Sequence, residues 1–176
     1  PEAQLDRFMF NVNINYPGAT DELEIVRRTT ARDAEEPLPV LSAEQILRLQ
    51  QLVRRVPVAD SLIRYAMSLA RASRPHEEEA PGFIRESVAW GAGPRASQFL
   101  VLGAKARALL RGRPAVTGKD VRAVAKSVLR HRILPNFSAE AEGITSDDLV
   151  ERLVETMPPA ESDALADGKL PPVLGS

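Results

Sequence analysis

Hydrophobic and polar positions alternate with period two in one clear stretch near the start of the chain. This alternation predicts a strand with one apolar face, and the Tyr16-Pro17-Gly18 sequence ends it. Residues 83–90 are ambiguous between a short strand and another extended form, and no other later segment predicts a strand with confidence. A lone strand cannot satisfy its backbone groups, so we expect its sheet partners to lie outside this chain or on another chain. The alternating apolar residues are Phe8, Phe10, Val12 and Ile14.

The rest of the pattern predicts helices with one apolar side and recognisable ends. Capping boxes are expected at Ser42, Thr117 and Thr145, each with a Gln or Asp three residues later. The predicted helices cover 20–28, 42–56, 60–74, 94–110, 117–132 and 145–157. The inward residues expected in the third are Ile63, Ala66, Met67 and Ala70, and in the fourth Phe99, Leu102, Ala106 and Leu109 or Leu110. Trp90 is expected to pack under the fourth helix.

Composition restricts the possible chemistry of these 176 residues. The chain has no cysteine, which excludes disulfides, thiolate metal sites and thiol catalysis and fits a reducing, cytoplasmic location. Two histidines are too few for a His-rich metal site, so we expect no bound metal. No apolar run is long enough to span a membrane. A first residue of Pro rather than Met suggests a fragment.

The net charge of −1 hides an uneven distribution. Residues 94–132 carry ten basic side chains and one acid, Asp120, whereas residues 138–176 carry nine acids and two bases. The two blocks could be solvated faces that attract each other. The basic block could instead meet the phosphates of a nucleotide or of nucleic acid. His131 lies between Arg130 and Arg132, whose like charge should lower its pKa, and we assign it no catalysis.

The sequence Gly91-Ala92-Gly93-Pro94-Arg95 predicts a sharp entry into a helix, with Pro94 as its first residue. Arg95 then stands in the first turn, where free N–H groups and the helix dipole already favour an anion. An arginine there is unfavourable for the helix itself, so its place makes sense if a phosphate or carboxylate is its partner. The alternative is a surface arginine that faces solvent. The nearby GRPAVTGKD sequence fails as a phosphate-binding P-loop, because its spacing is one residue too long and Asp120 replaces Ser or Thr.

Arg7 stands where the predicted strand begins, after a polar turn and before Phe8. A guanidinium fixed at the end of an element can reach the phosphate of a neighbouring subunit. The alternative is a surface patch of Asp6 and Arg7, which the local sequence alone favours.

Two motifs together resemble the MoxR family of AAA+ ATPases. PEAQLDRF, followed by FxVxIxYP (with x any residue) and a helix, resembles the end of that family's ATPase core. WGAGPRAS resembles its sensor 2 motif GASPRA, with Gly93 in place of Ser, and the surrounding helices resemble the AAA+ helical lid. The resemblance covers roughly residues 1–135, and the motif pair is more specific than either motif alone.

The resemblance implies a mainly α fold, in which a helical lid bundle follows one orphan strand of a truncated α/β ATPase core. Residues 1–17 would be the end of the core and 18–135 the lid domain with sensor 2. Residues 136–158 would form a C-terminal helix, and 159–176 a flexible tail.

The resemblance also implies roles for individual residues. Arg7 matches the arginine finger, which acts in trans on ATP held by the adjacent subunit. Arg95 matches sensor 2, which contacts the γ-phosphate and couples nucleotide state to lid position; action on its own subunit or on a neighbour stays open. Tyr16 and Pro17 would lie at the hinge near the adenine.

The function implied for the full-length protein is ATP hydrolysis coupled to chaperone-like remodelling or maturation of partner proteins. ATP with Mg²⁺ would be bound mainly by the core, so this fragment, without Walker A and Walker B motifs, should be inactive. A homo-oligomeric ring, with six subunits expected, and a partner with a von Willebrand factor A domain are also implied. Two alternatives remain: a basic helical module that binds nucleic acid, and a non-catalytic protein-interaction domain that uses the charged 76–82 loop and the acidic tail.

Overall fold

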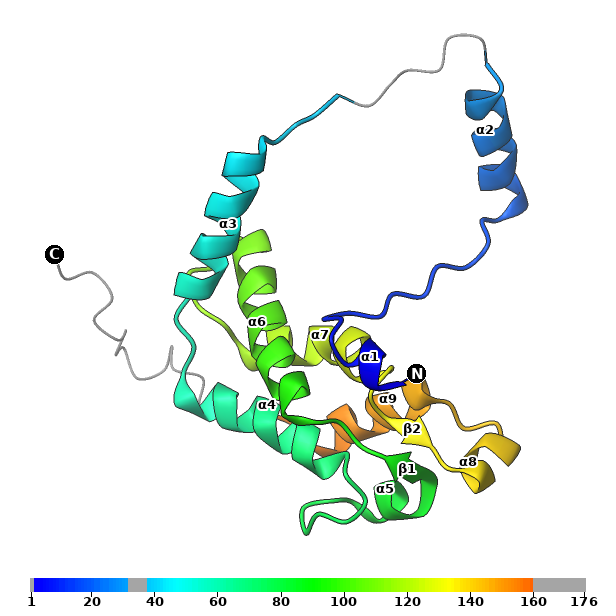
Figure 1. Ribbon diagram of the computed structural model, residues 1–176, viewed down its shortest axis with the longest axis vertical. Coiled ribbons are helices and arrows are strands. Elements are labelled where there is room, and N and C mark those ends of the chain that lie inside the picture. The colour runs from blue at the N-terminus through cyan, green and yellow to red at the C-terminus, as the bar shows by residue number, and fades with distance from the viewer. Residues whose placement is uncertain (1, 32–37, 160–176) are drawn as a thin grey trace, which may run out of the picture. The chain divides into compact units, whose positions relative to one another are not determined.

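The computed structural model describes residues 2–31 and 38–159, and Figure 1 labels their helices and strands. The chain divides into two compact units, Val12–Gln50 and Pro1–Asn11 together with Gln51–Ser176. All but the first residue of the expected tail falls outside the described residues. None of the helices described combines the length and the apolar content needed to cross a bilayer.

The smaller unit contains α2 (Ala19–Thr29) and most of α3 (Ala43–Arg55). The capping box predicted at the start of α3 is present: Gln45 N donates to Ser42 Oγ at 3.2 Å, and Ser42 N donates to Gln45 Oε1 at 2.7 Å. The N-cap of α2 is Gly18, two residues before the predicted cap at Thr20.

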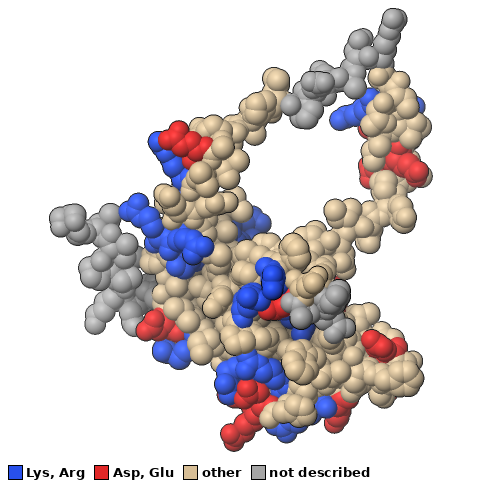
Figure 2. Space-filling model, in the orientation of Figure 1, with Lys and Arg blue, Asp and Glu red and all other residues tan. Residues whose placement is uncertain are grey.

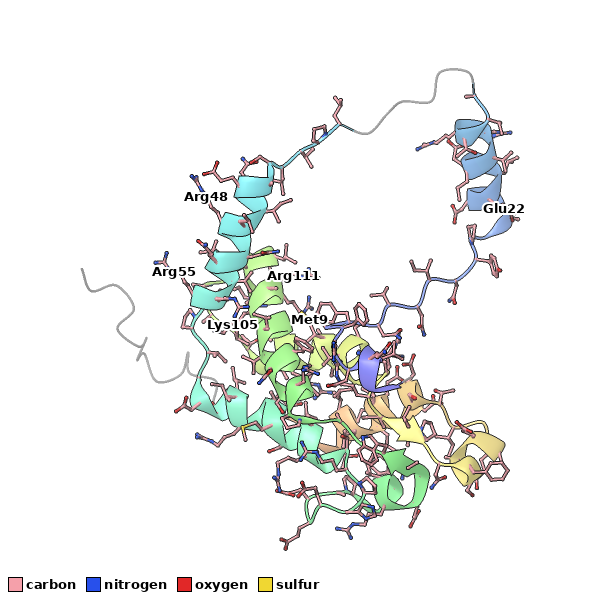
Figure 3. The ribbon with its side chains drawn as sticks, in the orientation of Figure 1. Met9, Glu22, Arg48, Arg55, Lys105 and Arg111 are labelled. Carbon is pink, nitrogen blue, oxygen red and sulfur yellow. The ribbon has the colours of Figure 1, made fainter. Side chains whose placement is uncertain are left out.

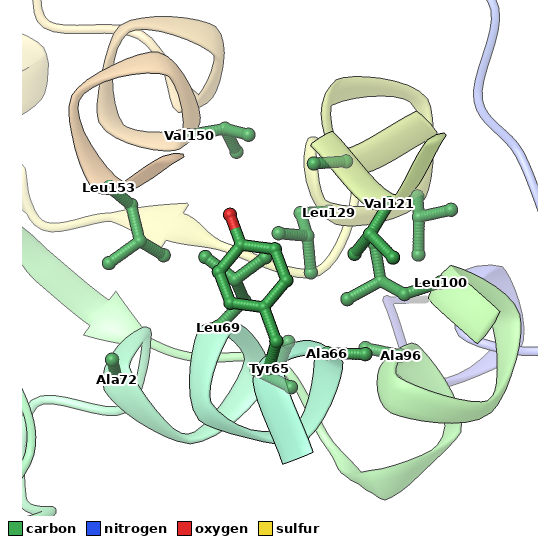
Figure 4. Close-up of a cluster of buried hydrophobic side chains, with 14 of the residues drawn as sticks. Tyr65, Ala66, Leu69, Ala72, Ala96, Leu100, Val121, Leu129, Val150 and Leu153 are labelled. Atoms are coloured by element: carbon green, nitrogen blue, oxygen red, sulfur yellow. The ribbon is translucent and has the colours of Figure 1, made fainter. Parts of the chain in front are cut away.

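Four helices form the core of the larger unit: α4 (Asp60–Ala72), α6 (Pro94–Leu110), α7 (Gly118–Leu129) and α9 (Ser146–Thr156). Helix α6 packs against α4 and α7, and α9 packs against α7 and α4. Their apolar side chains meet in one cluster, of which Figure 4 shows a part. The largest fully buried apolar side chains are Leu69, Ile84, Leu100, Leu129, Ile133, Leu153, Val121, Val128 and Val150. This bundle confirms the predicted mainly helical, lid-like fold.

The predicted inward face of α4 is partly wrong. Ala66 and Ala70 are buried as predicted, but Met67 is 46% exposed and Ile63 is only partly buried. Apolar residues occupy adjacent positions on this helix, so two overlapping stripes fit the sequence equally well. The stripe that packs begins one residue earlier and includes Leu62, Tyr65 and Leu69.

Helix α6 has the predicted bounds but a different buried face. The predicted residues Phe99, Leu102, Ala106 and Leu109 are only partly covered, and Leu110 is exposed. Because α6 is apolar on most sides, its pattern does not fix one face. The side with small residues faces α4 and α7, since small side chains let helices approach closely. The buried residues are Ala96, Leu100, Gly103, Ala104 and Ala108.

Short elements close one end of the bundle. They are α5 (Gly82–Ser87), β1 (Val88–Trp90), β2 (Leu134–Pro135) and α8 (Phe137–Ala141). Strands β1 and β2 pair antiparallel, with an irregular register between Val88 and Trp90. The prediction that Trp90 packs under α6 is wrong, because its side chain is 71% exposed. The register shift explains why Val88 is buried and Trp90 is not.

The orphan strand is present only as an unpaired segment without regular secondary structure in residues 10–18. At its start, Asn11 N donates to Ser127 O at 2.9 Å. Phe8, Val12 and Ile14 are all exposed. A strand needs a neighbour to pair with, and the described residues offer this segment none.

The loop after α4 is held by ion pairs rather than left free. Arg71 contacts Glu77 at 2.7 Å and Glu79 at 3.0 Å, and Arg74 contacts Glu77 at 3.0 Å. These ion pairs use the carboxylates of Glu77 and Glu79, two of the three acids in the loop. The loop is therefore a weaker candidate for a surface that binds a basic partner.

A buried carboxylate fixes the start of α7. Asp120 is 1% exposed; its Oδ2 accepts from Thr117 N at 3.0 Å, completing the predicted capping box, and from Arg113 Nη1 at 2.7 Å. Burial by itself raises the pKa of Asp120, but the hydrogen bonds from Arg113 and Thr117 outweigh it, so the pKa is lowered. The charged form of Asp120 therefore stabilises the fold.

We expect Asp120→Asn to lower the free energy of unfolding by about 2 kcal/mol at neutral pH, because the charge partner of Arg113 is lost. Folding lowers the pKa of Asp120 below its ordinary value of 3.8, so its contribution is present above that pH and disappears as pH falls below it. Urea unfolding at several pH values measures this difference.

Asp148→Asn is the matched control, since Asp148 fills the same place in the exposed capping box of α9. Its effect should be smaller at neutral pH. Equal losses for the two variants, or a difference at Asp120 that persists below pH 3, would contradict the assignment.

Candidate phosphate-binding surface

The turn before α6 is held against the end of α4. The buried Ser73 hydroxyl accepts from Ala92 N at 2.9 Å, and Arg74 Nε donates to Ala92 O at 2.8 Å. A Cβ added to Gly91 would lie 2.3 Å from the backbone oxygen of Ser73, so only glycine fits this approach. Gly93 is the N-cap and Pro94 the first residue of α6, as predicted. The turn thus fixes where the first residues of α6 stand.

Arg95 lies in the first turn of α6 with its side chain 45% exposed. Its Nη1 donates to Asp6 Oδ2 at 2.7 Å. The anion beside this arginine is therefore a carboxylate of the same chain, from a residue 89 positions away. A partly exposed pair of this kind is weak in water, so a more highly charged anion could replace the carboxylate.

Asp6 is shared between two arginines. Its Oδ1 accepts from Arg132 Nε at 2.9 Å, while its Oδ2 faces Arg95. Burial by itself raises the pKa of Asp6, but the hydrogen bonds from Arg132 and Arg95 reverse the effect and lower the pKa. Asp6 is therefore a charged bridge between the N-terminal segment and the bundle.

Arg7 follows this bridge directly, and its side chain is exposed. Its backbone N–H donates to Gln4 O at 3.3 Å in the turn after α1 (Glu2–Leu5). Within the described residues its guanidinium has no hydrogen bond or ion pair. Arg95 therefore binds the residue that directly precedes Arg7 in the chain, and the Arg7 side chain stays exposed.

The segment around Arg7 is bound to the end of α7 by a buried arginine. The Arg132 side chain is 1% exposed, and its Nη2 donates to Asp6 O at 2.8 Å and to Phe8 O at 2.7 Å. Its Nη1 contacts Met9 O at 3.4 Å and the Val128 carbonyl. We call residues 6–9 the anchored segment. The sequence marks Arg132 as part of the basic block and as a neighbour of His131, but no local pattern indicates partners more than 120 residues away.

His131 adds a contact to the same segment, with Nε2 3.1 Å from Phe8 O. Its pKa is lowered, as predicted, but mainly by burial, with the positive charge of Arg132 adding to it. The predicted lowering of the His131 pKa is confirmed, but its main cause is burial and not the like charge that the sequence indicates.

Tyr16 and Pro17 belong to the smaller unit, and Tyr16 is fully exposed. Their role as hinge residues near an adenine stays a prediction. The described residues contain no group of three or more His, Asp or Glu side chains that could hold a metal ion.

The basic block is largely neutralised within the fold. Six of its ten basic residues pair with carboxylates, two of them with α9. On the face that Figure 2 shows, blue and red groups lie next to each other at several places. Two of these residues, Lys126 and Arg130, join the basic block to the acidic block, and the other four are neutralised by Asp6 and Asp120, which leaves fewer free cations for a nucleic acid. The paired basic residues are Arg95, Arg107, Arg113, Lys126, Arg130 and Arg132, and their partners are Asp6, Asp120, Asp147 and Glu151.

Comparison with known proteins finds similarity over the whole chain. A family model described as the AAA lid domain matches residues 83–153. Chaperone MoxR1 of Mycobacterium tuberculosis is 34% identical over 99% of this chain and 46% of its own length. Protein MoxR of Paracoccus denitrificans is 30% identical over 90% of this chain and 50% of its own length.

The fold is also similar to a crystal structure of a presumed ATPase from Cytophaga hutchinsonii. The TM-score is 0.82 at 32% identity, over 88% of this chain and 47% of that one. The chain thus spans about half the length of the relatives it matches.

Proposed function

This chain is a MoxR-like AAA+ region that carries the helical lid domain, and from that premise we propose that it presents Arg7 and Arg95 to the phosphates of ATP at a subunit boundary. In the full-length protein the lid would couple ATP binding and hydrolysis to chaperone-like remodelling or maturation of partner proteins. The similarity to a chaperone of the MoxR type supports this role.

The observation that carries the proposal is the Asp6 bridge. Through it, Arg95 stands beside the residue that precedes Arg7, although 88 positions separate the two arginines in sequence. We therefore propose that both guanidinium groups act from this one unit. A finger that reaches a neighbouring subunit would bring Arg95 toward the same nucleotide, so we propose action in trans for both.

In this proposal, Arg7 and Arg95 act through their positive charge. A guanidinium placed on the transferring phosphoryl group stabilises the charge of the transition state, and a finger of this kind is worth about 10³–10⁵ in rate. Arg95, at the dipole-positive end of α6, suits the terminal phosphate. Mg²⁺ accompanies ATP in the AAA+ family, and the proposal assigns it no ligand among the described residues.

The assembly and location belong to the same proposal. A trans-acting finger requires a ring of like subunits, for which six is the expected number, and a protein with a von Willebrand factor A domain is the expected partner. A cytoplasmic location is proposed, supported by the absence of cysteine from the sequence.

The experiment that tests the coupling role of Arg95 is hydrogen exchange of the full-length protein with and without a non-hydrolysable ATP analogue. In the wild type, nucleotide should slow exchange in residues 90–100. Arg95→Ala should abolish that response and reduce turnover by about tenfold or more, as one charge-assisted contact is lost.

Arg111→Ala is the matched control, since Arg111 is an exposed arginine at the opposite end of the same helix. It should keep the nucleotide response and the turnover of the wild type. An Arg95→Ala protein that responds to nucleotide like the wild type would exclude the coupling role.

A further inference from the structure

We infer that Arg132 is the positioning residue for Arg7: its guanidinium fixes the anchored segment to the end of α7, and so sets the place from which Arg7 reaches a phosphate. The inference rests on the proposed role of Arg7 as a finger. It adds a residue that neither the motifs nor the comparisons mark.

The first support is that all the N–H donors of the Arg132 guanidinium have an acceptor. A guanidinium carries five N–H groups, and Arg132 makes five contacts, four of them to the anchored segment. The fifth goes to the Val128 carbonyl near the end of α7, the helix that Arg132 follows. Phe99 of α6 covers the guanidinium at 5.1 Å from its ring centroid. A side chain with this set of partners has one orientation.

The second support is the position of these contacts on either side of Arg7. Arg132 binds the carbonyl and carboxylate of Asp6 before it and the carbonyl of Phe8 after it. The backbone of Arg7 is therefore held from both sides while its side chain stays exposed. Catalytic groups need this fixed base, since a shift of about 1 Å can cost roughly 10²-fold in rate.

The third support is independent packing on α6 of Met9, in the anchored segment, and of Phe10, which follows it. A Cβ added to Gly103 would lie 3.1 Å from Phe10 Cζ and 3.3 Å from Met9 Cε, so both side chains rest on this glycine. Figure 3 labels Met9 of the anchored segment and Lys105 of α6. The anchored segment thus packs on the helical bundle, and movement of α6 and α7 would carry Arg7 with it.

A lysine cannot replace this arginine. Its ammonium has three donors on one point and cannot span a carboxylate and two carbonyls as a planar fork does. Arg132→Lys keeps the charge and most of the volume, so it tests geometry. Arg130→Lys is the matched control, because Arg130 lies two residues away and its side chain binds Asp147, at 2.8 and 2.7 Å, with no contact to the anchored segment among the residues that the structure describes.

The test measures turnover and nucleotide affinity of the full-length protein. Arg132→Lys should lower kcat by about 10²-fold with Kd for ATP changed less than about threefold, and Arg130→Lys should change neither. In an Arg7→Ala background, Arg132→Lys should have no further effect, since a residue that acts through Arg7 has nothing left to position. Hydrogen exchange of residues 4–11 in the 176-residue chain should rise at least tenfold in Arg132→Lys and stay unchanged in Arg130→Lys.

Each other outcome overturns the inference. An unchanged kcat or unchanged exchange in Arg132→Lys shows that the segment is held without it. Losses that multiply with those of Arg7→Ala show a structural role that does not act through Arg7. Should Arg132→Lys fail to fold, His131→Ala removes one contact to Phe8 from a partly exposed position, and its loss in turnover should likewise vanish in the Arg7→Ala background. If Arg7→Ala alone leaves turnover unchanged, the proposed function fails first and the inference fails with it.

Discussion

We expect that replacing Arg7 by Ala in the full-length protein will reduce ATP turnover by roughly 10³-fold or more, while the affinity for nucleotide will change by less than about threefold. The reason is that an exposed guanidinium on a fixed backbone contributes only when charge develops on the transferring phosphate. Steady-state turnover and equilibrium binding of a fluorescent ATP analogue separate the two effects.

The control for this variant is Arg64→Ala, an exposed arginine on α4 that lies in the same unit. Its turnover should equal that of the wild type. In rings mixed from wild-type and Arg7→Ala subunits, activity should fall with the number of sites whose neighbour carries the substitution. A variant that hydrolyses ATP at the wild-type rate would refute the finger.

Substituting Gly91 by Ala destabilises the bundle by about 3 kcal/mol, the second large effect we expect. The added Cβ would lie 2.3 Å from Ser73 O and 2.6 Å from Arg74 Cα, and both are backbone atoms that no rotamer change can move. The turn must then separate from α4, which breaks the hydrogen bonds between Ala92 and the Ser73 and Arg74 side chains. Urea unfolding followed by circular dichroism measures the loss.

Gly93→Ala is the matched control two residues later in the same turn. A Cβ at Gly93 meets nothing within 4 Å, and its φ of −77° is open to any residue. The loss should stay below about 1 kcal/mol, the value of a poorer N-cap. Equal losses at the two glycines would show that the close approach to Ser73 is not what requires glycine.

Local signals in the sequence predicted most of the helices and their ends. Capping boxes at Ser42, Thr117 and Thr145 are all formed, because each depends on residues three positions apart. Pro94 after two glycines likewise defined the start of α6. The inward faces of α4 and α6 were harder, since apolar residues occupy more than one side of each helix. Only packing against the neighbouring helices selects among them.

The candidate site was predictable in part. Arg7 and Arg95 were identified by their motifs, and an anion beside Arg95 was expected from its place in the first helical turn. The Asp6 carboxylate as that anion, and Arg132 as its second partner, depend on contacts 89 and 126 positions apart. No periodicity or spacing encodes such contacts. The same holds for Trp90, whose exposure follows from strand pairing with β2.

The most direct test is a structure of the full-length assembly with a non-hydrolysable ATP analogue and Mg²⁺. We predict that the guanidinium groups of residues 7 and 95 lie within about 3 Å of phosphate oxygens of a nucleotide held by the adjacent subunit, with Arg132 still bound to the anchored segment. Both groups pointing into solvent, away from any subunit boundary, would contradict the account.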